Sequence, residues 1–305
     1  MTTGFSLKAY LSSQKRRVDK ALDRYLPRAG AAPGEIHRAL RYSVFAGGKR
    51  LRPVLCLAAV EACGGSSEKA LPTACALELI HTYSLVHDDL PAMDDDDFRR
   101  GRPTSHKVFG EGMAVLAGDA LLTAGFELMA RNARVRGVTA DAVARVIETV
   151  GEAAGSRGMV GGQAVDLQMA ARTKGLPKSA RARRLDYIHR HKTGALIRAS
   201  LRAGALLAGA GRAQLSALDR YGESIGLAFQ IADDVLDIVG NKKILGKKGS
   251  DRDNDKLTYP AVYGLEASQR KAREEIARAK GALKPFGPRA RVFMDLADFI
   301  VQREN

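Results

Sequence analysis

Residues 223–239 read ESIGLAFQIADDVLDIV, and this stretch decides the class of fold. A helix built from it is apolar nearly all round, which is typical of a helix buried inside a bundle. Its polar exceptions are Gln230, Asp233, Asp234 and Asp237, spaced i, i+3, i+4 and i+7 and therefore on one stripe. Carboxylates on a buried helix are costly unless a bound cation or a water-filled cleft compensates their charge. A solvent-facing stripe is the alternative, but the opposite faces of the helix are apolar as well.

A second acidic cluster repeats this arrangement within the first hundred residues. His81, Ser84 and Asp88 stand at i, i+3 and i+7 among apolar neighbours. Pro91 disfavours helical geometry at the residue before it, so we expect the helix to end there. Asp94 then belongs to the following turn, from which it could fold back beside Asp88. Taken alone, this segment could also be a solvated acidic loop, but two such clusters at the ends of buried helices weaken that interpretation.

The ligand types in both clusters favour a hard cation. Carboxylate oxygens without a His–Cys set favour Mg²⁺, which typically joins carboxylates to substrate phosphates. A metal that holds phosphate should have basic residues nearby, because Arg binds phosphate in a bidentate manner and Lys supplies a point charge. The sequence places such residues at Arg99 and Arg100, at Lys247 and Lys248, at Lys192, and in the segment GGKRLRP, residues 47–53.

Composition and periodicity point to one helical domain. The 305 residues are 45% hydrophobic, lack Trp and include only 6% aromatic residues, which suits close-packed helices better than a sheet. Helical periodicity covers almost every segment, with long helices predicted over 178–209 and 259–283, whereas 91–110 and 241–255 are predicted loops. We find no convincing strands and no linker, so we expect a single all-α domain over residues 1–305.

The net charge of +15 suggests an anionic partner, which could be nucleic acid, an acidic membrane surface or a phosphorylated small molecule. A basic nucleic-acid-binding protein would explain the charge but not the carboxylates on buried stripes. A di-iron bundle would need Glu-x-x-His pairs, and none stands beside these aspartates. The three cysteines fit no zinc spacing, the N-terminus lacks a signal-peptide stretch, and no run reaches about 18 apolar residues. We therefore expect a soluble cytoplasmic protein with no nucleic-acid partner and no stable membrane insertion.

Six segments in order resemble the motif set of the short-chain trans isoprenyl diphosphate synthases, most closely the bacterial-type farnesyl diphosphate synthases. The resemblance spans roughly residues 35–270. It implies the all-α isoprenoid synthase fold, a helical bundle around a central cavity, usually in a homodimer. The segments are GGKRLRP (47–53), HDDLPAMDDDDFRRG (87–101), GGQAVDL (161–167), HKTGAL (191–196), GLAFQIADDVLD (226–237) and TYPA (258–261).

The resemblance implies a prenyltransferase of isoprenoid and lipid biosynthesis. It would condense isopentenyl diphosphate with dimethylallyl or geranyl diphosphate to give farnesyl diphosphate, with about three Mg²⁺ ions per active site. The implied metal ligands are Asp88 and Asp94 on one wall and Asp233 with Asp237 on the other. Asp89 and Asp234 would lie farther from the metal. Geranyl or geranylgeranyl diphosphate synthases remain alternatives, as does a class I terpene cyclase, although GGKRLRP weighs against cyclisation.

The same resemblance implies the substrate-binding and catalytic residues. The positions that would hold isopentenyl diphosphate are Lys49, Arg52, His81 and Arg100. Those that would hold the allylic diphosphate are Arg99, Lys192, Gln230 and Lys247. Thr193 matches a position that lines the developing cation, so the implied catalytic set is Lys192, Thr193, Gln230, Asp88 and Asp233.

The resemblance implies that Tyr83, five residues before Asp88, determines the length of the product chain. By helical geometry Ser84 lies more directly beneath Asp88, so geometry alone does not make Tyr83 the floor of a chain pocket. The resemblance associates a bulky aromatic residue there with a fifteen-carbon product, and a core aromatic residue without influence on length is the alternative. The segment 241–256 is the candidate lid. It departs from the usual Gly-Lys before TYPA by carrying Asp255-Lys256, so the resemblance assigns no role to Lys256.

Overall fold

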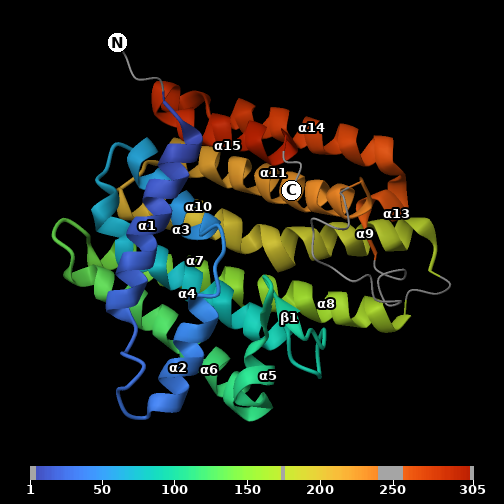
Figure 1. The fold of residues 1–305 in the computed structure, drawn as a ribbon. Coiled ribbons are helices and arrows are strands. Elements are labelled where there is room, and N and C mark those ends of the chain that lie inside the picture. Colours follow the sequence, from blue (N-terminus) through green and yellow to red (C-terminus); the bar gives the residue numbers. More distant parts are fainter. Residues whose placement is uncertain (1–4, 173–175, 240–256, 303–305) are drawn as a thin grey trace. The chain divides into compact units, whose positions relative to one another are not determined.

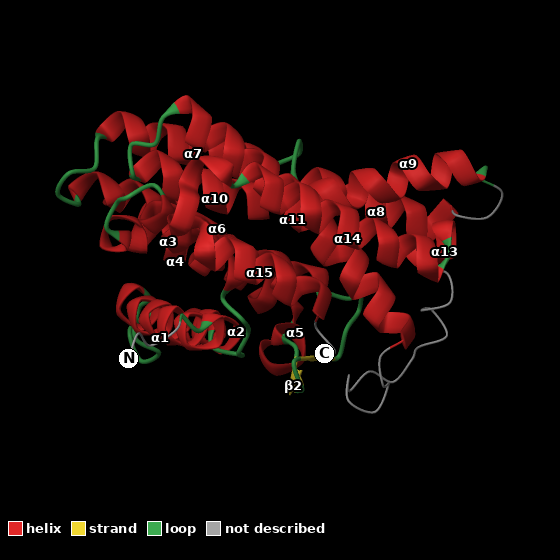
Figure 2. Ribbon diagram, turned by 90° about the horizontal axis from the view of Figure 1, so that it is seen from above, coloured by secondary structure: helices red, strands yellow, loops and turns green. Residues whose placement is uncertain are grey.

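The computed structural model describes residues 5–172, 176–239 and 257–302. These residues are almost entirely helical, which confirms the all-α prediction; Figure 2 shows the helices in red and the two short yellow strands of a hairpin near α5. The predicted lid with Lys247, Lys248, Asp255 and Lys256 lies outside the described residues. The chain divides into two compact units, Met1–Ile147 with Leu206–Gly209 and Glu148–Ala205 with Ala210–Asn305.

The first unit is built on α4, whose residues from Leu71 through Ile80 are all buried. It packs most closely against α6, and Gly125 permits the approach, because a Cβ there would lie 2.7 Å from Ile80 Cγ1. The elements of this unit are α1 (Leu7–Tyr25), α2 (Gly34–Val44), α3 (Leu51–Ala62), η1 (Ser67–Ala70), α4 (Leu71–Asp88), β1 (Phe98–Arg99), β2 (Arg102–Pro103), α5 (Ser105–Phe109), α6 (Glu111–Arg131) and η2 (Asn132–Arg134).

The segment 91–110 is not the plain loop that the sequence predicts. Strands β1 and β2 pair antiparallel, with Arg99 opposite Arg102, and α5 follows directly. The two residues of the connecting turn, Arg100 and Gly101, have φ of 54° and 75°. Positive φ at both central positions is the mark of a type I′ hairpin turn, whose twist matches that of the strands. Two-residue strands are too short for a period-two pattern, so no sequence pattern indicates them.

One helical stretch, Glu111–Arg134, is long and apolar enough to cross a membrane by length and composition. Asp119 and Glu127 interrupt this stretch, so it contains no uninterrupted run of about 18 apolar residues. The same test is passed by core helices of soluble proteins, and α6 packs against both α4 and α2. Only 39% of its apolar window is buried, and Val115 and Leu116 are 41% and 56% exposed.

The second unit is built on α11, which runs alongside α14 (Figure 1). The predicted helix 178–209 contains a turn of π-helix, η3, and the predicted helix 259–283 breaks at Gly264, where φ is 85°. Helix α7 (Ala140–Ala154) has residues in both units. The other elements are α8 (Met159–Arg172), α9 (Lys178–Ile188), η3 (His189–Gly194), α10 (Ala195–Leu207), α11 (Arg212–Val239), α13 (Tyr259–Tyr263), α14 (Leu265–Ala282), η5 (Lys284–Ala290) and α15 (Arg291–Gln302).

Candidate functional site

The first acidic cluster is a helix end followed by a tight turn. Asp88 is the last residue of α4, and the turn after Pro91 brings the backbone N–H of Asp94 to the carbonyl oxygen of Asp88 at 2.8 Å. The N–H of Asp95 donates to the carbonyl oxygen of Leu90 at 3.2 Å, with Asp95 in the left-handed region at φ 54°. The predicted helix end and the return of Asp94 to Asp88 are both confirmed.

The side chain of Asp89 pairs with an arginine of the hairpin. Its side chain is buried and accepts from Arg99 Nε at 2.6 Å, while Arg99 also lies 3.5 Å from a carboxylate oxygen of Asp96. Burial raises the pKa of Asp89 and the charge of Arg99 opposes that rise. Asp89 therefore fixes Arg99 at the edge of the hairpin, and its place farther from the metal stays a prediction.

The carboxylates that remain suit a cation that takes further ligands from its substrate. Asp88 is half-buried and Asp94 is exposed. Among the residues that the structure describes, no group of three or more His, Cys, Asp or Glu side chains could hold a metal ion by itself. Mg²⁺ commonly binds through one or two carboxylates, several waters and substrate phosphates, so paired aspartates of this kind fit it.

The GGKRLRP segment joins α2 to α3, and its three cations have unequal roles. Arg50 is 3% exposed and bonds to Asp19 at 2.7 Å and to Glu78 at 2.8 Å. It stabilises the fold. Lys49 is exposed in the same segment, and Arg52 lies in the first turn of α3 with its Nε buried and without a hydrogen-bond partner among the described residues.

Arg100 is held against this segment from the tip of the hairpin. Its guanidinium donates to the carbonyl oxygen of Gly47 and lies against Gly48, where a Cβ would be 2.9 Å from Arg100 Cζ. His81 on α4 faces the same cations. Burial and the charges of Arg52 and Arg100 hold the pKa of His81 well below its usual range. Burial also lowers the pKa of Arg52 to about 10. The structure therefore brings three of the predicted isopentenyl diphosphate ligands together.

The second acidic cluster lies in the last turns of α11. Asp234 accepts the backbone N–H of Tyr259 at 2.8 Å and lies 3.4 Å from His189 Nε2, whose ring stacks on that of Tyr259. Asp234 thus connects α11 to the TYPA segment. The two residues of this cluster that are predicted to bind the metal are Asp233, which is half-buried, and Asp237, which is exposed.

The π-helical turn η3 presents two predicted catalytic side chains. Thr193 Oγ1 donates to Gln230 Oε1 at 2.9 Å, and Lys192 Nζ lies 2.8 Å from Asp166. Gly162 on α8 allows this packing, because a Cβ there would lie 2.7 Å from Lys192 Cα. Single turns of π-helix are frequent at functional sites. The structure brings Thr193 and Gln230 together, and their catalytic roles stay a prediction.

Sequence reasoning missed two residues of α8 as site candidates. Asp166 pairs with Lys192, and Gln163 has both amide atoms buried without a hydrogen-bond partner among the described residues. They stand at i and i+3 and so share a helix face. The segment GGQAVDL contains both residues. Its two glycines, which permit close packing of helices, stand directly before them and could have indicated a site there.

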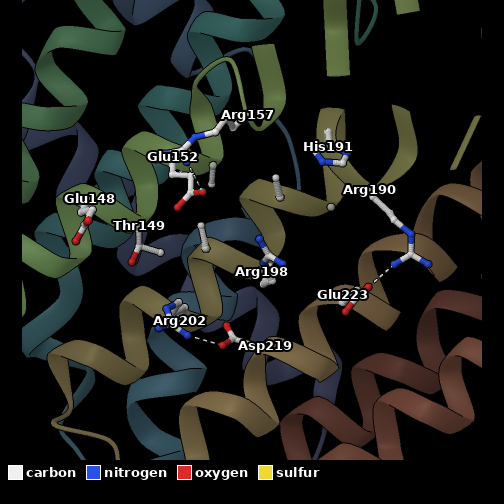
Figure 3. Close-up of a pocket in the computed structure, with 14 residues that line it drawn as sticks. Glu148, Thr149, Glu152, Arg157, Arg190, His191, Arg198, Arg202, Asp219 and Glu223 are labelled. Carbon is white, nitrogen blue, oxygen red and sulfur yellow. Dashed lines mark hydrogen bonds and ion pairs between the residues drawn. The ribbon is translucent and has the colours of Figure 1, made fainter. Parts of the chain in front are cut away.

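A pocket of about 590 Å³ in the second unit contains none of the predicted site residues. It is lined by four arginines and four carboxylates, whose charges cancel, so it does not favour a diphosphate. Figure 3 shows Arg190 directed at Glu223 and Arg202 at Asp219. This pocket is therefore a weaker candidate for the substrate site than the acidic clusters.

Tyr83 lies on α4 and is 7% exposed. Its ring meets that of His87 edge-on, with centroids 5.7 Å apart, and burial together with the charge of Asp88 raises the pKa of its hydroxyl. Ser84 is half-buried and donates to the carbonyl oxygen of His81 at 2.8 Å. The influence of Tyr83 and Ser84 on product length stays a prediction.

Comparison with known proteins gives consistent matches along the chain. The model of the family described as Polyprenyl synthetase matches residues 33–284. The geranylgeranyl diphosphate synthase of Cyanophora paradoxa is 46% identical, over 100% of this chain and 99% of that protein. The farnesyl diphosphate synthase of Geobacillus stearothermophilus is 47% identical, over 92% of each. The crystal structure of an FPP/GFPP synthase from Zymomonas mobilis superposes with a TM-score of 0.85 at 34% identity, covering 97% of this chain and 98% of that chain.

Proposed function

This chain belongs to the polyprenyl synthetase family, and from that premise we propose that it is a Mg²⁺-dependent farnesyl diphosphate synthase. As an isoprenyl diphosphate synthase it elongates prenyl chains, joining isopentenyl diphosphate to an allylic diphosphate. The observation that carries the substrate assignment is the cationic cluster of Arg52 and Arg100 beside a neutral His81, with Arg52 Nε unpartnered among the described residues. A charged group with a buried, unpartnered nitrogen costs free energy unless an anion binds it.

Each substrate has its own set of residues in this proposal. Arg52, Arg100 and Lys49 bind the diphosphate of isopentenyl diphosphate, and His81 donates a hydrogen bond as a neutral ring. Arg99 and Lys192 bind the diphosphate of the allylic substrate. Both cations form ion pairs with carboxylates, Asp89 and Asp166 respectively, which hold the two basic side chains in place.

The reaction forms one carbon–carbon bond. The allylic C–O bond breaks, pyrophosphate leaves, and the double bond of isopentenyl diphosphate attacks the resulting allylic cation. A proton is then lost, and we propose that the departing pyrophosphate accepts it. Asp88 and Asp94 in the first unit, and Asp233 and Asp237 in the second, are the residues that would hold Mg²⁺, which would supply positive charge to the leaving group. The chain itself orients Thr193 and Gln230 by the hydrogen bond between them, and we propose that both side chains line the place where the cation develops.

A product assay tests the function directly. The protein is incubated with dimethylallyl and isopentenyl diphosphates and Mg²⁺, and the products are separated by chain length. We expect a fifteen-carbon diphosphate, loss of turnover on chelation of the metal, and losses of orders of magnitude for Asp88→Ala and Asp233→Ala with unchanged circular dichroism. A twenty-carbon main product would overturn the farnesyl assignment alone. Retained turnover in the aspartate variants would overturn the metal assignment.

We also propose that the enzyme is a homodimer that uses the exposed apolar face of α6. Val115 and Leu116 stand on this face, where large apolar side chains are otherwise open to water. Light scattering should give twice the chain mass, and Leu116→Arg should reduce it to the mass of one chain. A wild-type monomer at micromolar concentration would contradict the proposal.

A further inference from the structure

His87 stands directly before the proposed metal ligand Asp88, and its ring points at the neighbouring helix. Its Nε2–H donates to the carbonyl oxygen of Val115 on α6 at 3.0 Å. Its edge-on contact with Tyr83 lies one turn earlier on α4. The imidazole therefore joins three things: the last turn of α4, the aromatic ring below it and the backbone of α6.

Gly118 makes room for this ring. A Cβ at Gly118 would lie 2.8 Å from Cε1 of His87 and closer still to Nε2 and Cδ2, so the Nε2 edge of the ring occupies the space that a side chain at Gly118 would fill. Real Cβ atoms essentially never approach that closely, and a methyl group would force the imidazole out. Gly118 is fully enclosed in the packing between α4 and α6, whereas His87 is 28% exposed and has solvent to move into.

The carbonyl that His87 contacts belongs to a helix, so its regular acceptor role is already filled within α6. The Val115 carbonyl therefore does not need the His87 donor, and the effect of this hydrogen bond is to hold the end of α4 in place. The Asp94 N–H already caps the carbonyl oxygen of Asp88, and the His87 bond adds a side-chain anchor to α6 in the same final turn, where the chain reverses at Pro91. A helix end of this kind frays unless it is held.

We propose that His87, seated against Gly118, is a positioning residue that locks the end of α4 to α6 and thereby fixes Asp88 and Tyr83. The inference rests on the proposed function, since it takes Asp88 as a metal ligand. Residues that orient metal ligands typically change metal affinity or activity by about 10- to 100-fold when replaced. Losing the lock therefore raises the Mg²⁺ concentration needed for half-maximal turnover by about 10-fold.

The test compares Gly118→Ala with Gly112→Ala. Both replace a glycine of α6 by the same residue, but a Cβ at Gly112 meets nothing within 4 Å. Mg²⁺ binding is measured by calorimetry in the presence of inorganic pyrophosphate, which needs no turnover. We expect about 10-fold weaker Mg²⁺ binding for Gly118→Ala and wild-type binding for Gly112→Ala. Product length is read in parallel, and a changed ratio of fifteen- to twenty-carbon products is expected only for Gly118→Ala.

His87 variants separate positioning from packing. His87→Gln keeps an N–H donor of similar reach and should recover most of the Mg²⁺ affinity that His87→Ala loses. Adding His87→Ala to Gly118→Ala should cost little more than either change alone, because both remove the same lock. Thermal unfolding checks that the variants fold.

Two failures are distinguishable. If Asp88→Ala abolishes Mg²⁺ binding while Gly118→Ala and His87→Ala bind as the wild type does, the lock is wrong and the metal site stands. If Asp88→Ala binds Mg²⁺ and pyrophosphate as well as the wild type, the proposed metal site is wrong, and the lock loses its function with it.

Discussion

The backbone N–H of Asp94 donates to the carbonyl oxygen of Asp88 at 2.8 Å, so a residue six positions on returns to the helix end. The turn depends on the left-handed conformation of Asp95, whose φ is 54°. A β-branched residue there pays roughly 1–2 kcal/mol, whereas glycine adopts it freely. Asp95→Val should therefore lower the free energy of unfolding by about 1 kcal/mol and raise the Mg²⁺ concentration at half-maximal turnover, while Asp95→Gly should change neither. Equal impairment by Gly and Val would show that the carboxylate matters and the turn does not.

Gly48 and Arg100 form the second close contact on which a prediction rests. A methyl group on Gly48 would lie 2.9 Å from Arg100 Cζ and displace the guanidinium from the Gly47 carbonyl. Gly48→Ala should therefore raise KM for isopentenyl diphosphate by about 10-fold, the worth of a hydrogen bond to a charged group. Gly47→Ala is the matched control, because Gly47 also has positive φ but nothing within 4 Å of its Cβ. It should lower stability without the change in KM; a similar KM for both variants would contradict the contact.

Tyr83 tests the assignment of product length. The residue is almost completely buried on the helix that carries Asp88, so a smaller side chain leaves space in the direction of the helix start. Tyr83→Ala should shift the products from fifteen toward twenty carbons, measured by chromatography of the hydrolysed prenyl alcohols. Tyr83→Phe keeps the ring and should keep the fifteen-carbon product. An unchanged profile in Tyr83→Ala would make this tyrosine an ordinary core residue.

The helix pattern of the sequence was sufficient for the all-α class, the end of α4 and the return of Asp94. It was also sufficient for the stripe on α11, since apolar periodicity and proline position depend on local chemistry alone. It could not show that Asp234 bonds to Tyr259. A helical stripe places neighbouring carboxylates on the same face, and only their contacts with distant segments distinguish them.

Two other features depend on packing between segments distant in sequence, and a third, the hairpin, is local but too short to leave a sequence pattern. The π-helical turn at Lys192 and Thr193 arises where Gly162 and Gly226 let neighbouring helices approach η3, and no periodicity encodes it. The hairpin at Arg100 has strands too short for a pattern. The pairing of Lys192 with Asp166 required knowledge of which face of α8 meets η3.

The hydrogen bond from Thr193 to Gln230 predicts that two conservative substitutions of Thr193 will have different effects on kcat. Thr193→Val keeps the shape but removes the donor at 2.9 Å, so the Gln230 amide loses the partner that orients it. We expect kcat to fall by about 10-fold, with little change in KM, because orientation matters at the developing cation more than in substrate binding. Thr193→Ser retains the donor and should stay within about twofold of the wild type. If Val and Ser behave alike, the hydroxyl does not orient Gln230 during turnover.

His81 predicts how stability depends on pH. Burial and the charges of Arg52 and Arg100 depress the pKa of its ring in the folded protein, whereas the unfolded chain titrates near 6.5. Below about pH 6.5 the unfolded chain therefore binds a proton that the folded protein does not, and stability falls as pH falls, by up to about 1.4 kcal/mol per pH unit. His81→Gln removes this proton. Its free energy of unfolding, measured with urea from pH 7.5 to 5.5, should decline less steeply than that of the wild type below pH 6.5, with the two curves parallel above it. Parallel curves over the whole range would mean that His81 titrates alike in both states and that the cationic cluster does not hold it neutral.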